Sequence, residues 1–129
     1  MQLPLVTTDI QVRFADIDML GHVSNAVYGQ YFDLGRVDFF IKLSEIEKPP
    51  LSVVGSMQMN FLREIKFSDK PSIVTWCSDI EGKRMTVQHK IYVNDKCVVN
   101  GSTVLVGFDK ETRSSCLLPS HWQPSPSPE

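Results

Sequence analysis

Residues 26–43 read AVYGQYFDLGRVDFFIKL, and apolar side chains recur on most sides of the helix that this segment would form. A helix with so wide an apolar surface is one that other structure covers over much of its circumference. Ser24 and Asn25 precede it and suit a helix N-cap, because their short side chains can accept backbone N–H groups. Pro49-Pro50 follow it and would stop the helix. The sequence therefore predicts one long, enclosed helix at the centre of the fold.

Strand patterns surround this helix on both sides. Upstream, the alternation of Ile10, Val12 and Phe14 with polar residues predicts a short half-buried strand. Downstream, four further strands are predicted, the first with a bulge or bend at Phe61-Leu62. These four cover residues 57–67, 73–78, 85–93 and 97–108. Tight turns between them imply an antiparallel sheet. A strongly curved five-stranded sheet wrapped around one helix would bury both patterns, which gives an α+β fold.

The composition limits the classes of function. A chain of 129 residues with 42% hydrophobic and 22% charged residues fits one soluble domain, here expected over residues 1–118. The Pro- and Ser-rich segment 119–129 is expected to be a disordered tail. A net charge of −2 argues against nucleic-acid binding. No apolar run is long enough to cross a membrane, and no signal peptide is recognised. Three cysteines without C-x-x-C spacing suggest free thiols, so a cytoplasmic protein is expected.

Unusual chemistry concentrates in the turn between the first strand and the helix, residues 14–25. This turn holds two carboxylates, Asp16 and Asp18, together with Gly21 and His22. It ends at a helix N-terminus, whose first N–H groups lack intrahelical partners and carry partial positive charge. Those amides could polarise a thioester carbonyl, while an aspartate attacks its carbon or activates a water. Such chemistry needs neither a metal nor a cofactor.

The same turn and helix carry a long motif, F-x-D-x-D-x-x-G-H-V-x-N-x-x-Y-x-x-Y-F-[DE]-x-x-R. This chain supplies it between Phe14 and Arg36. The motif resembles the signature of 4-hydroxybenzoyl-CoA-thioesterase-like hotdog proteins, and the resemblance extends through the strand order to about Asp109. One departure is Ser24, where many relatives have a second Asn; we expect this to alter capping more than catalysis.

The resemblance implies a fold, an activity and a site. It implies the hotdog fold and hydrolysis of acyl-CoA thioesters, with Asp18 as the catalytic carboxylate, either nucleophile or general base. The backbone amide near Asn25 would polarise the carbonyl. Active sites would lie at the interface of a homodimer, which could pair further into a homotetramer. Coenzyme A would be held by basic and hydroxyl residues on the outer rim, some of them from a neighbouring subunit. An acyl carrier protein in place of coenzyme A stays open.

Other residues of the site are candidates on local grounds. His22 could orient a water or Asp18, or simply pack against the helix start. Gly21 permits close backbone approach to a substrate, and Tyr28 could fill the core or line a substrate channel. Lys83-Arg84, in a tight turn, is the best local candidate for phosphate binding. Arg63 could equally form an interface ion pair or contact coenzyme A. Asp16 is expected to orient the turn, His89 to be a satisfied buried residue, and Asp33 to pair locally with Arg36.

Alternative functions are weaker. A D-x-D phosphatase needs a parallel sheet and a later lysine, whereas this chain offers hairpins. An EF-hand fails because Val27 stands where the closing Glu should be. Gly55-Ser56 lacks the spacing of a nucleophile elbow. The serious competitor is a hotdog module that binds acyl-CoA or an acyl carrier protein without hydrolysing it, which the retention of Asp18 disfavours.

Overall fold

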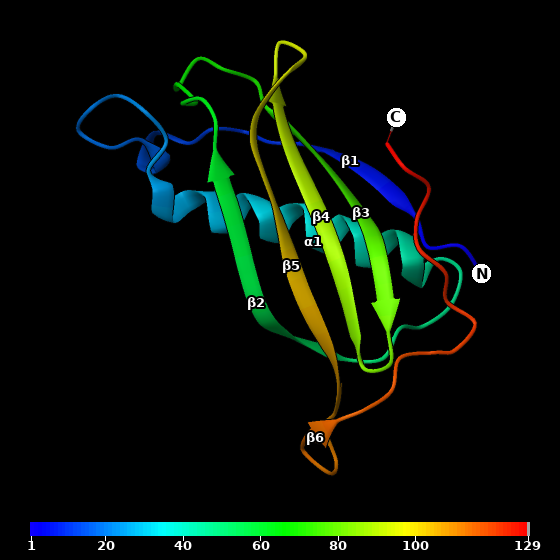
Figure 1. The fold of residues 1–129 in the computed structure, drawn as a ribbon. Coiled ribbons are helices and arrows are strands. Elements are labelled where there is room, and N and C mark those ends of the chain that lie inside the picture. Colours follow the sequence, from blue (N-terminus) through cyan, green and yellow to red (C-terminus); the bar gives the residue numbers. More distant parts are fainter. Residues whose placement is uncertain (129) are drawn as a thin grey trace.

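The computed structural model describes residues 1–128 and shows one long helix lying against an antiparallel sheet (Figure 1). The helix is α1 (Tyr28–Ser44), preceded without a break by the 3₁₀ turn η2 (Asn25–Val27). Five strands form the main sheet in the order β1-β3-β4-β5-β2, and β6 pairs only with β5. The strands are β1 (Leu5–Asp9), β2 (Ser52–Phe61), β3 (Ser72–Glu81), β4 (Arg84–Val93), β5 (Lys96–Asp109) and β6 (Ser114–Ser115). The predicted α+β hotdog fold is confirmed.

Two tight hairpins build the centre of the sheet. Gly82, with φ 61°, lies in the turn from β3 to β4, and Asn94 and Asp95, with φ 51° and 65°, form the turn from β4 to β5. In the turn from β4 to β5, both central residues have positive φ, which is the hairpin geometry that matches the twist of the strands. The prediction of a third tight turn, between β2 and β3, is wrong. β2 pairs with β5 instead, so residues 62–71 cross to the other side of the sheet.

The first strand lies farther upstream than its predicted position. β1 ends at Asp9, and the chain then leaves the sheet and enters the short 3₁₀ helix η1 (Phe14–Asp16). Ile10 and Val12 are nevertheless buried, whereas Phe14 is largely exposed. The alternation of residues 10–14 therefore correctly indicated that two side chains are buried. It does not correspond to a strand, because these residues do not form the ladder of hydrogen bonds that defines one.

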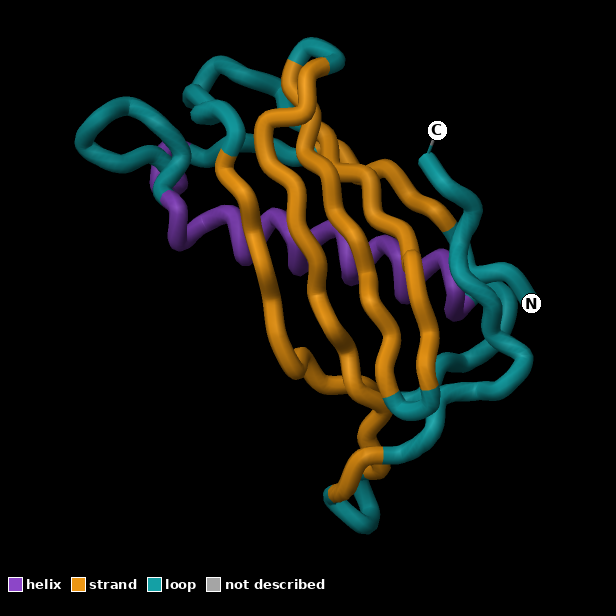
Figure 2. Tube along the Cα trace, in the orientation of Figure 1, coloured by secondary structure: helices purple, strands orange, loops and turns teal. Residues whose placement is uncertain are grey.

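The helix is covered on one face only. Its buried residues recur every three or four positions and pack on the sheet: Tyr28, Tyr31, Phe32, Gly35, Phe39 and Leu43. At Gly35 the approach is close enough that a Cβ would collide with Oγ1 of Thr75 on β3. Leu34, Val37 and Ile41 remain exposed, so in the single chain the helix is covered over less of its circumference than the sequence predicted. Figure 2 shows the helix crossing one side of the sheet. Among residues 1–128 no helix is long and apolar enough to cross a membrane.

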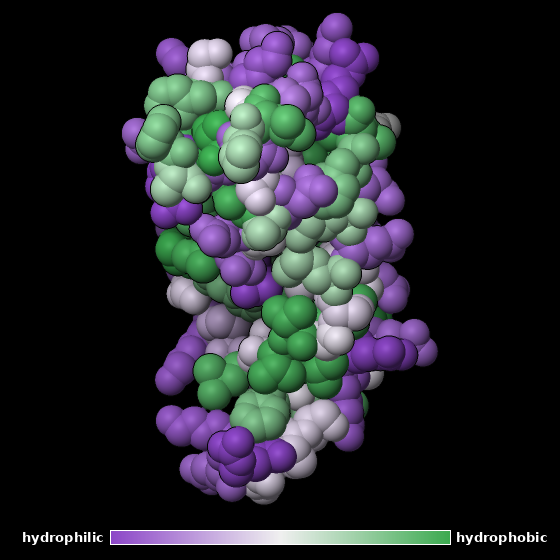
Figure 3. All heavy atoms as spheres, turned by 90° about the vertical axis from the view of Figure 1, so that its left-hand side faces the viewer, coloured by the Kyte–Doolittle hydropathy of each residue, from purple (hydrophilic) through white to green (hydrophobic). Residues whose placement is uncertain are grey.

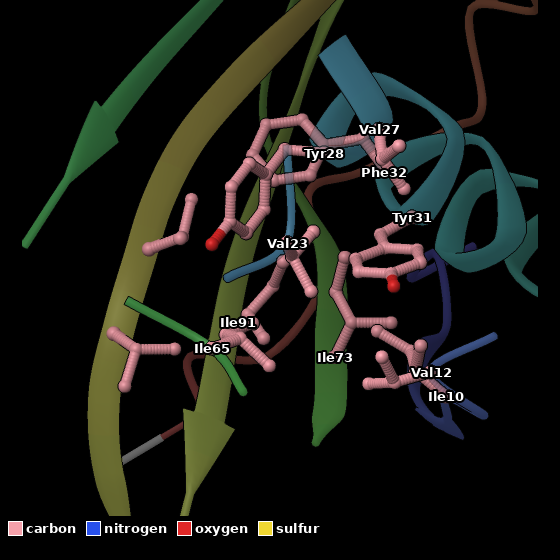
Figure 4. Packing of buried hydrophobic residues seen from close by; sticks show 12 residues of the cluster. Ile10, Val12, Val23, Val27, Tyr28, Tyr31, Phe32, Ile65, Ile73 and Ile91 are labelled. Carbon is pink, nitrogen blue, oxygen red and sulfur yellow. The ribbon is translucent and has the colours of Figure 1, made fainter. Parts of the chain in front are cut away.

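The core divides into two clusters along the helix. One surrounds Tyr28, Tyr31 and Phe32, whose side chains meet Ile73 and Ile91 of the sheet (Figure 4). The second surrounds the later half of the helix and includes residues of the C-terminal segment. Its buried members are Leu3, Phe39, Leu43, Cys77, Met85, Val87, Leu105, Leu118 and Trp122. The first cluster supports the helix start, where the candidate site lies.

The C-terminal segment packs against the domain, unlike the disordered tail expected from its composition. Trp122 is 5% exposed, and Gln123 forms a bridge with Gln2. Ser125 accepts a 2.8 Å hydrogen bond from the Cys77 backbone N–H and donates one of 2.7 Å to the Pro4 carbonyl. One buried tryptophan and a few hydrogen bonds thus hold a proline-rich segment that composition alone would leave unfolded. Figure 1 shows this segment running beside the N-terminus.

Candidate active site

The turn before the helix is fixed by the buried carboxylate of Asp16. Its Oδ2 accepts hydrogen bonds from the Arg13 backbone N–H at 3.0 Å and from the Tyr31 hydroxyl at 2.7 Å. Its Oδ1 accepts two from the Arg13 guanidinium, at 2.7 and 3.0 Å. Burial favours the neutral acid, but these hydrogen bonds outweigh it and lower the pKa of Asp16. Asp16 therefore orients the turn, as predicted, and ties it to α1.

Asp18 lies two residues farther along, where the turn is exposed. Its Oδ1 accepts hydrogen bonds from the backbone N–H groups of Leu20 at 2.9 Å and His22 at 3.3 Å. Its own N–H donates to the His22 carbonyl at 2.8 Å. Gly21 closes this loop with φ 85°, a conformation that favours glycine. Within residues 1–128, Oδ2 of Asp18 accepts no hydrogen bond. One oxygen orients the side chain, and the other is available to a water or a substrate.

A pocket of about 560 Å³ opens beside Asp18 at the start of the helix. It brings together four residues that the sequence analysis selected, namely Asp18, His22, Asn25 and Tyr28. Gly21 lies in the adjoining loop and does not line the cavity. The opposite wall is the end of β2 and the segment after it, residues 61–64. Of this wall only Arg63 was considered from the sequence, because the contact joins parts of the chain that no local pattern connects.

The first turn of the helix borders this pocket through Ser24 and Asn25. Ser24 takes the N-cap position with extended backbone, φ −63° and ψ 140°, but its side chain makes no capping hydrogen bond. Val27 N–H donates to the Ser24 carbonyl at 2.9 Å. The N–H groups of Asn25 and Ala26 come before the first intrahelical bond and have no acceptor within the helix. Unpaired N–H groups at a helix start carry partial positive charge, and of these two residues Asn25 lines the pocket whereas Ala26 does not.

His22 pairs with a residue that the sequence analysis did not select. Its Nε2 lies 2.9 Å from Oε2 of Glu64, and both residues line the pocket. The bridge between His22 and Lys66 and the hydrogen bond from Val23 N–H to the Ile65 carbonyl hold the two segments together. His22 therefore fixes the wall of the pocket, and it touches Asp18 only through its backbone. In the described part of the chain, no group of three or more His, Cys, Asp or Glu residues could hold a metal ion.

Tyr28 belongs both to the core and to the pocket. It is 2% exposed, and its ring lies 5.2 Å from that of Phe61 and 6.0 Å from that of Tyr31, measured between centroids. Burial raises the pKa of the Tyr28 phenol, the hydrogen bond with the Ile65 backbone opposes this, and the charges of Glu64 and Asp18 raise it further. The phenol therefore stays protonated at neutral pH, and the rings of Tyr28 and Phe61 both line the pocket.

Lys83 and Arg84 do not line this pocket in the single chain. They lie in the turn from β3 to β4, where Arg84 is in register with Val106 of β5. The pocket wall at Phe61 is in register with Val99, so it lies near the opposite end of the same strand. Lys83 Nζ instead lies 3.2 Å from the Ser115 hydroxyl.

The remaining polar candidates lie outside the site. His89 is buried between the hydroxyls of Thr75 at 3.3 Å and Thr103 at 3.0 Å, the satisfied core position that was predicted. Burial, and then the charge of Arg36, lower the pKa of His89 to about 3. Arg36 pairs with Asp33 at 3.1 Å, also as predicted.

Comparisons with known proteins agree with this architecture. The family model of the Thioesterase-like superfamily matches residues 12–128. The putative acyl-CoA thioesterase YneP of Bacillus subtilis is 27% identical over 89 residues, which cover 65% of this chain and 64% of YneP. A Thermus thermophilus thioesterase structure, complexed with coenzyme A and Zn, is 28% identical with a TM-score of 0.78, covering 92% of this chain and 87% of that one. A predicted thioesterase from Bacillus stearothermophilus, 22% identical with a TM-score of 0.79, shares the fold over 90% of this chain and 89% of its own.

The family match spans nearly the whole chain and includes the turn, the helix and every strand after them. These elements form the same hotdog fold as the similar structures. The chain therefore belongs to the Thioesterase-like superfamily and is a thioester hydrolase of the hotdog type.

Proposed function

We propose that this protein hydrolyses acyl thioesters of coenzyme A to a free acid and coenzyme A, with Asp18 at the reacting carbon. The observation that carries the proposal is the geometry of one cavity. Asp18, whose Oδ2 accepts no hydrogen bond within residues 1–128, and Asn25, at the start of the helix, line the same pocket. A carboxylate and an oxyanion-binding group on two sides of a cavity are what attack on a carbonyl requires.

The chemistry would proceed in one of two ways. The carbonyl oxygen of the thioester binds at the amides of Asn25 and Ala26, which stabilise the negative charge that develops on it. Asp18 then either removes a proton from a water that attacks the carbon, or attacks the carbon itself and forms an anhydride that water hydrolyses. In both routes the C–S bond breaks, water supplies the OH of the acid, and the departing thiolate takes up a proton.

The other pocket residues have supporting roles in this proposal. Tyr28 and Phe61 offer an apolar surface to the acyl group, beyond the reacting carbon. His22, held by Glu64, keeps the wall of the pocket in place. Coenzyme A as the thiol portion is supported by the Thermus thermophilus thioesterase, whose structure contains coenzyme A.

The edge of the sheet suggests how two copies would assemble. β2 pairs with β5 on one side and with no strand of this chain on the other, within residues 1–128. Its side chains include the exposed apolar residues Val53, Val54, Met57 and Phe61. Figure 3 shows apolar side chains gathered on the side of the molecule that carries this strand. Unpaired, apolar strand edges favour pairing with another strand, so we propose a homodimer in which two β2 strands lie antiparallel.

In this proposed dimer, Lys83 and Arg84 of one copy would lie toward the Asp18 pocket of the other copy. The turn that holds them is level with the start of β2, because Arg84 faces Val106 and Ser52 faces Gly107 across β5. In an antiparallel β2 pair, the start of one β2 lies beside the end of the other. The Lys83-Arg84 turn of one copy would then lie at the same end of the joined sheet as the Asp18 pocket of its partner. Phosphate contacts from a neighbouring subunit are compatible with this arrangement.

The proposed function is tested by the release of thiol from acyl-CoAs. We expect the wild-type protein to release free thiol from some members of a panel of short, medium-chain and aromatic acyl-CoAs. Asp18→Asn should lower kcat by at least about 100-fold, the usual contribution of a positioned base. Asp79→Asn, an exposed carboxylate on β3 outside the pocket, is the matched control. Trapping an acyl-enzyme with hydroxylamine separates the nucleophilic route from the general-base route.

Two results would contradict the proposal. If Asp18→Asn retained wild-type kcat, the carboxylate would have no part in the chemistry. If the protein bound acyl-CoAs tightly but released no thiol across the panel or from acyl carrier protein thioesters, it would be a binding module instead.

A further inference from the structure

A second cavity, of about 590 Å³, adjoins the Asp18 pocket. Arg63 and Glu64 line both cavities, so the two are neighbours that share one wall. The second cavity lies between the segment 63–69 and the turn from β4 to β5. Three of its lining residues are cations, Arg63, Lys66 and Lys96, and we refer to these three as the basic cup.

The cations of the basic cup are not engaged elsewhere in the described part of the chain. All three residues are exposed, and their side chains form none of the ion pairs or hydrogen bonds within residues 1–128. The two carboxylates nearby already have other partners. Glu64 pairs with His22, and Oδ2 of Asp69 accepts a 2.9 Å hydrogen bond from the Lys66 backbone N–H. The cup is therefore free to bind an anion.

The backbone that carries these cations is held in place. The N–H groups of Leu62 and Arg63 donate to the Val98 carbonyl at 2.9 and 3.0 Å. The Ile65 carbonyl accepts a 2.8 Å hydrogen bond from Val23, next to the Asp18 turn. A site whose backbone is fixed before binding loses less conformational entropy when the ligand arrives.

We propose that the basic cup binds the phosphates of the coenzyme A whose thioester lies in the Asp18 pocket. The inference rests on the proposed function, since it assigns the second half of the same substrate. Coenzyme A carries a diphosphate and a 3′-phosphate, joined to its sulfur by the long, flexible pantetheine arm. An arginine suits bidentate contact with a phosphate, and lysines serve as point charges. Arg63, on the shared wall, lies where that arm would pass from one cavity to the other.

Binding of a fragment without a thioester tests the cup directly. Adenosine 3′,5′-bisphosphate, titrated into the full chain by calorimetry, should bind the wild-type protein. We expect Arg63→Gln, Lys66→Gln and Lys96→Gln each to weaken this binding roughly tenfold, the loss expected for one charge-assisted hydrogen bond. Lys110→Gln makes the same change of charge on an exposed loop outside the cup and should bind as the wild type does. Thermal unfolding of each variant verifies that it folds.

Kinetics with two substrates separate the cup from the chemistry. Lys66→Gln and Lys96→Gln, whose residues do not line the Asp18 pocket, should lower kcat/KM for an acyl-CoA, yet leave it unchanged for the matching N-acetylcysteamine thioester, which has no phosphates. The inference is overturned if the three cup variants bind the bisphosphate and coenzyme A as tightly as the wild type does. It is also overturned if only Lys83→Gln and Arg84→Gln weaken this binding, because the phosphates would then bind at the turn from β3 to β4. If no thioester is hydrolysed but the bisphosphate still binds through the cup, the proposed function fails and the phosphate site stands.

Discussion

The hydroxyl of Tyr31 donates a 2.7 Å hydrogen bond to Oδ2 of the buried Asp16, and this bond joins the first turn of α1 to the turn that carries Asp18. Asp16 is only two residues from Asp18, so the packing of the helix helps to set where the reacting carboxylate lies. Burial, and then this hydrogen bond and the charge of Asp16, raise the pKa of the Tyr31 phenol.

We therefore expect Tyr31→Phe to destabilise the protein and to slow hydrolysis. Removing the hydroxyl leaves a buried carboxylate with one donor fewer, which costs about 1–3 kcal/mol. Urea unfolding measures the loss of stability, and a lower kcat is the expected effect of a displaced Asp18. Tyr92→Phe is the control, because within residues 1–128 the Tyr92 hydroxyl makes no hydrogen bond. Equal stability of Tyr31→Phe and wild type would show that the bond contributes nothing.

The buried His89 makes stability depend on pH. Its pKa is about 3 in the folded protein, below the ordinary value of 6.5, so the unfolded chain binds a proton more readily. The contribution of His89 is therefore complete above pH 6.5 and is lost as the pH falls toward 3, up to the order of 5 kcal/mol. Urea unfolding between pH 7 and pH 4.5 should show this decline in the wild type. His89→Gln should flatten the curve over the same range, and a curve as steep as that of the wild type would refute the assignment.

Two glycines of α1 should respond in opposite ways to a methyl group. Gly35→Ala places a Cβ against Oγ1 of Thr75 and should destabilise the protein by about 1–3 kcal/mol through overpacking. At Gly29 the same Cβ would meet only Cε of Met59 at 3.7 Å, an ordinary contact. Gly29→Ala should be neutral or stabilise by up to about 1 kcal/mol, because alanine is the better helix former. Denaturation midpoints of the two variants decide this, and equal midpoints would contradict the close approach of helix and sheet.

The packed C-terminal segment predicts a large effect at one tryptophan. Trp122 is buried, and its Nε1 donates a 3.2 Å hydrogen bond to Glu47. Trp122→Ala should cost about 3–5 kcal/mol, as for other buried aromatic residues. Leu117→Ala, at a side chain that is 71% exposed, is the control and should change stability little. If the two substitutions had the same small effect, the segment would not be packed in solution.

Local patterns predicted what local forces decide. The helix was expected over residues 26–43 and occupies Tyr28–Ser44 after a short 3₁₀ turn. It could be predicted because the spacing of apolar residues along the sequence is a direct signal of a helix. The tight turns on both sides of β4 were predicted correctly, and in the structure Gly82 and Asn94 lie in them with positive φ, which turns of this kind favour at glycine and asparagine. The turn containing Asp18 was found from its concentration of chemical groups and from a family motif.

The remainder depends on contacts between distant parts of the chain. No local signal shows that β2 pairs with β5, or that residues 61–64 face Asp18 across a pocket. Glu64, Lys66 and Lys96 were missed for this reason, whereas Arg63 had been considered as a residue that could contact coenzyme A. The packing of the C-terminal segment was missed because its overall composition, rich in proline and serine, indicates disorder. The single buried side chain of Trp122 holds the segment against the domain and is not visible in that composition.

The order of the strands also bears on how the chain reaches this structure. The β3–β4 and β4–β5 pairings join neighbours in sequence, so each closes a short loop at little entropic cost. The β1–β3 pairing joins segments with α1 and β2 between them, and the β2–β5 pairing joins segments with β3 and β4 between them. We therefore expect the hairpins to form before the outer strands are added, and the outer strands to set a folding rate slower than that of a helical bundle of equal length.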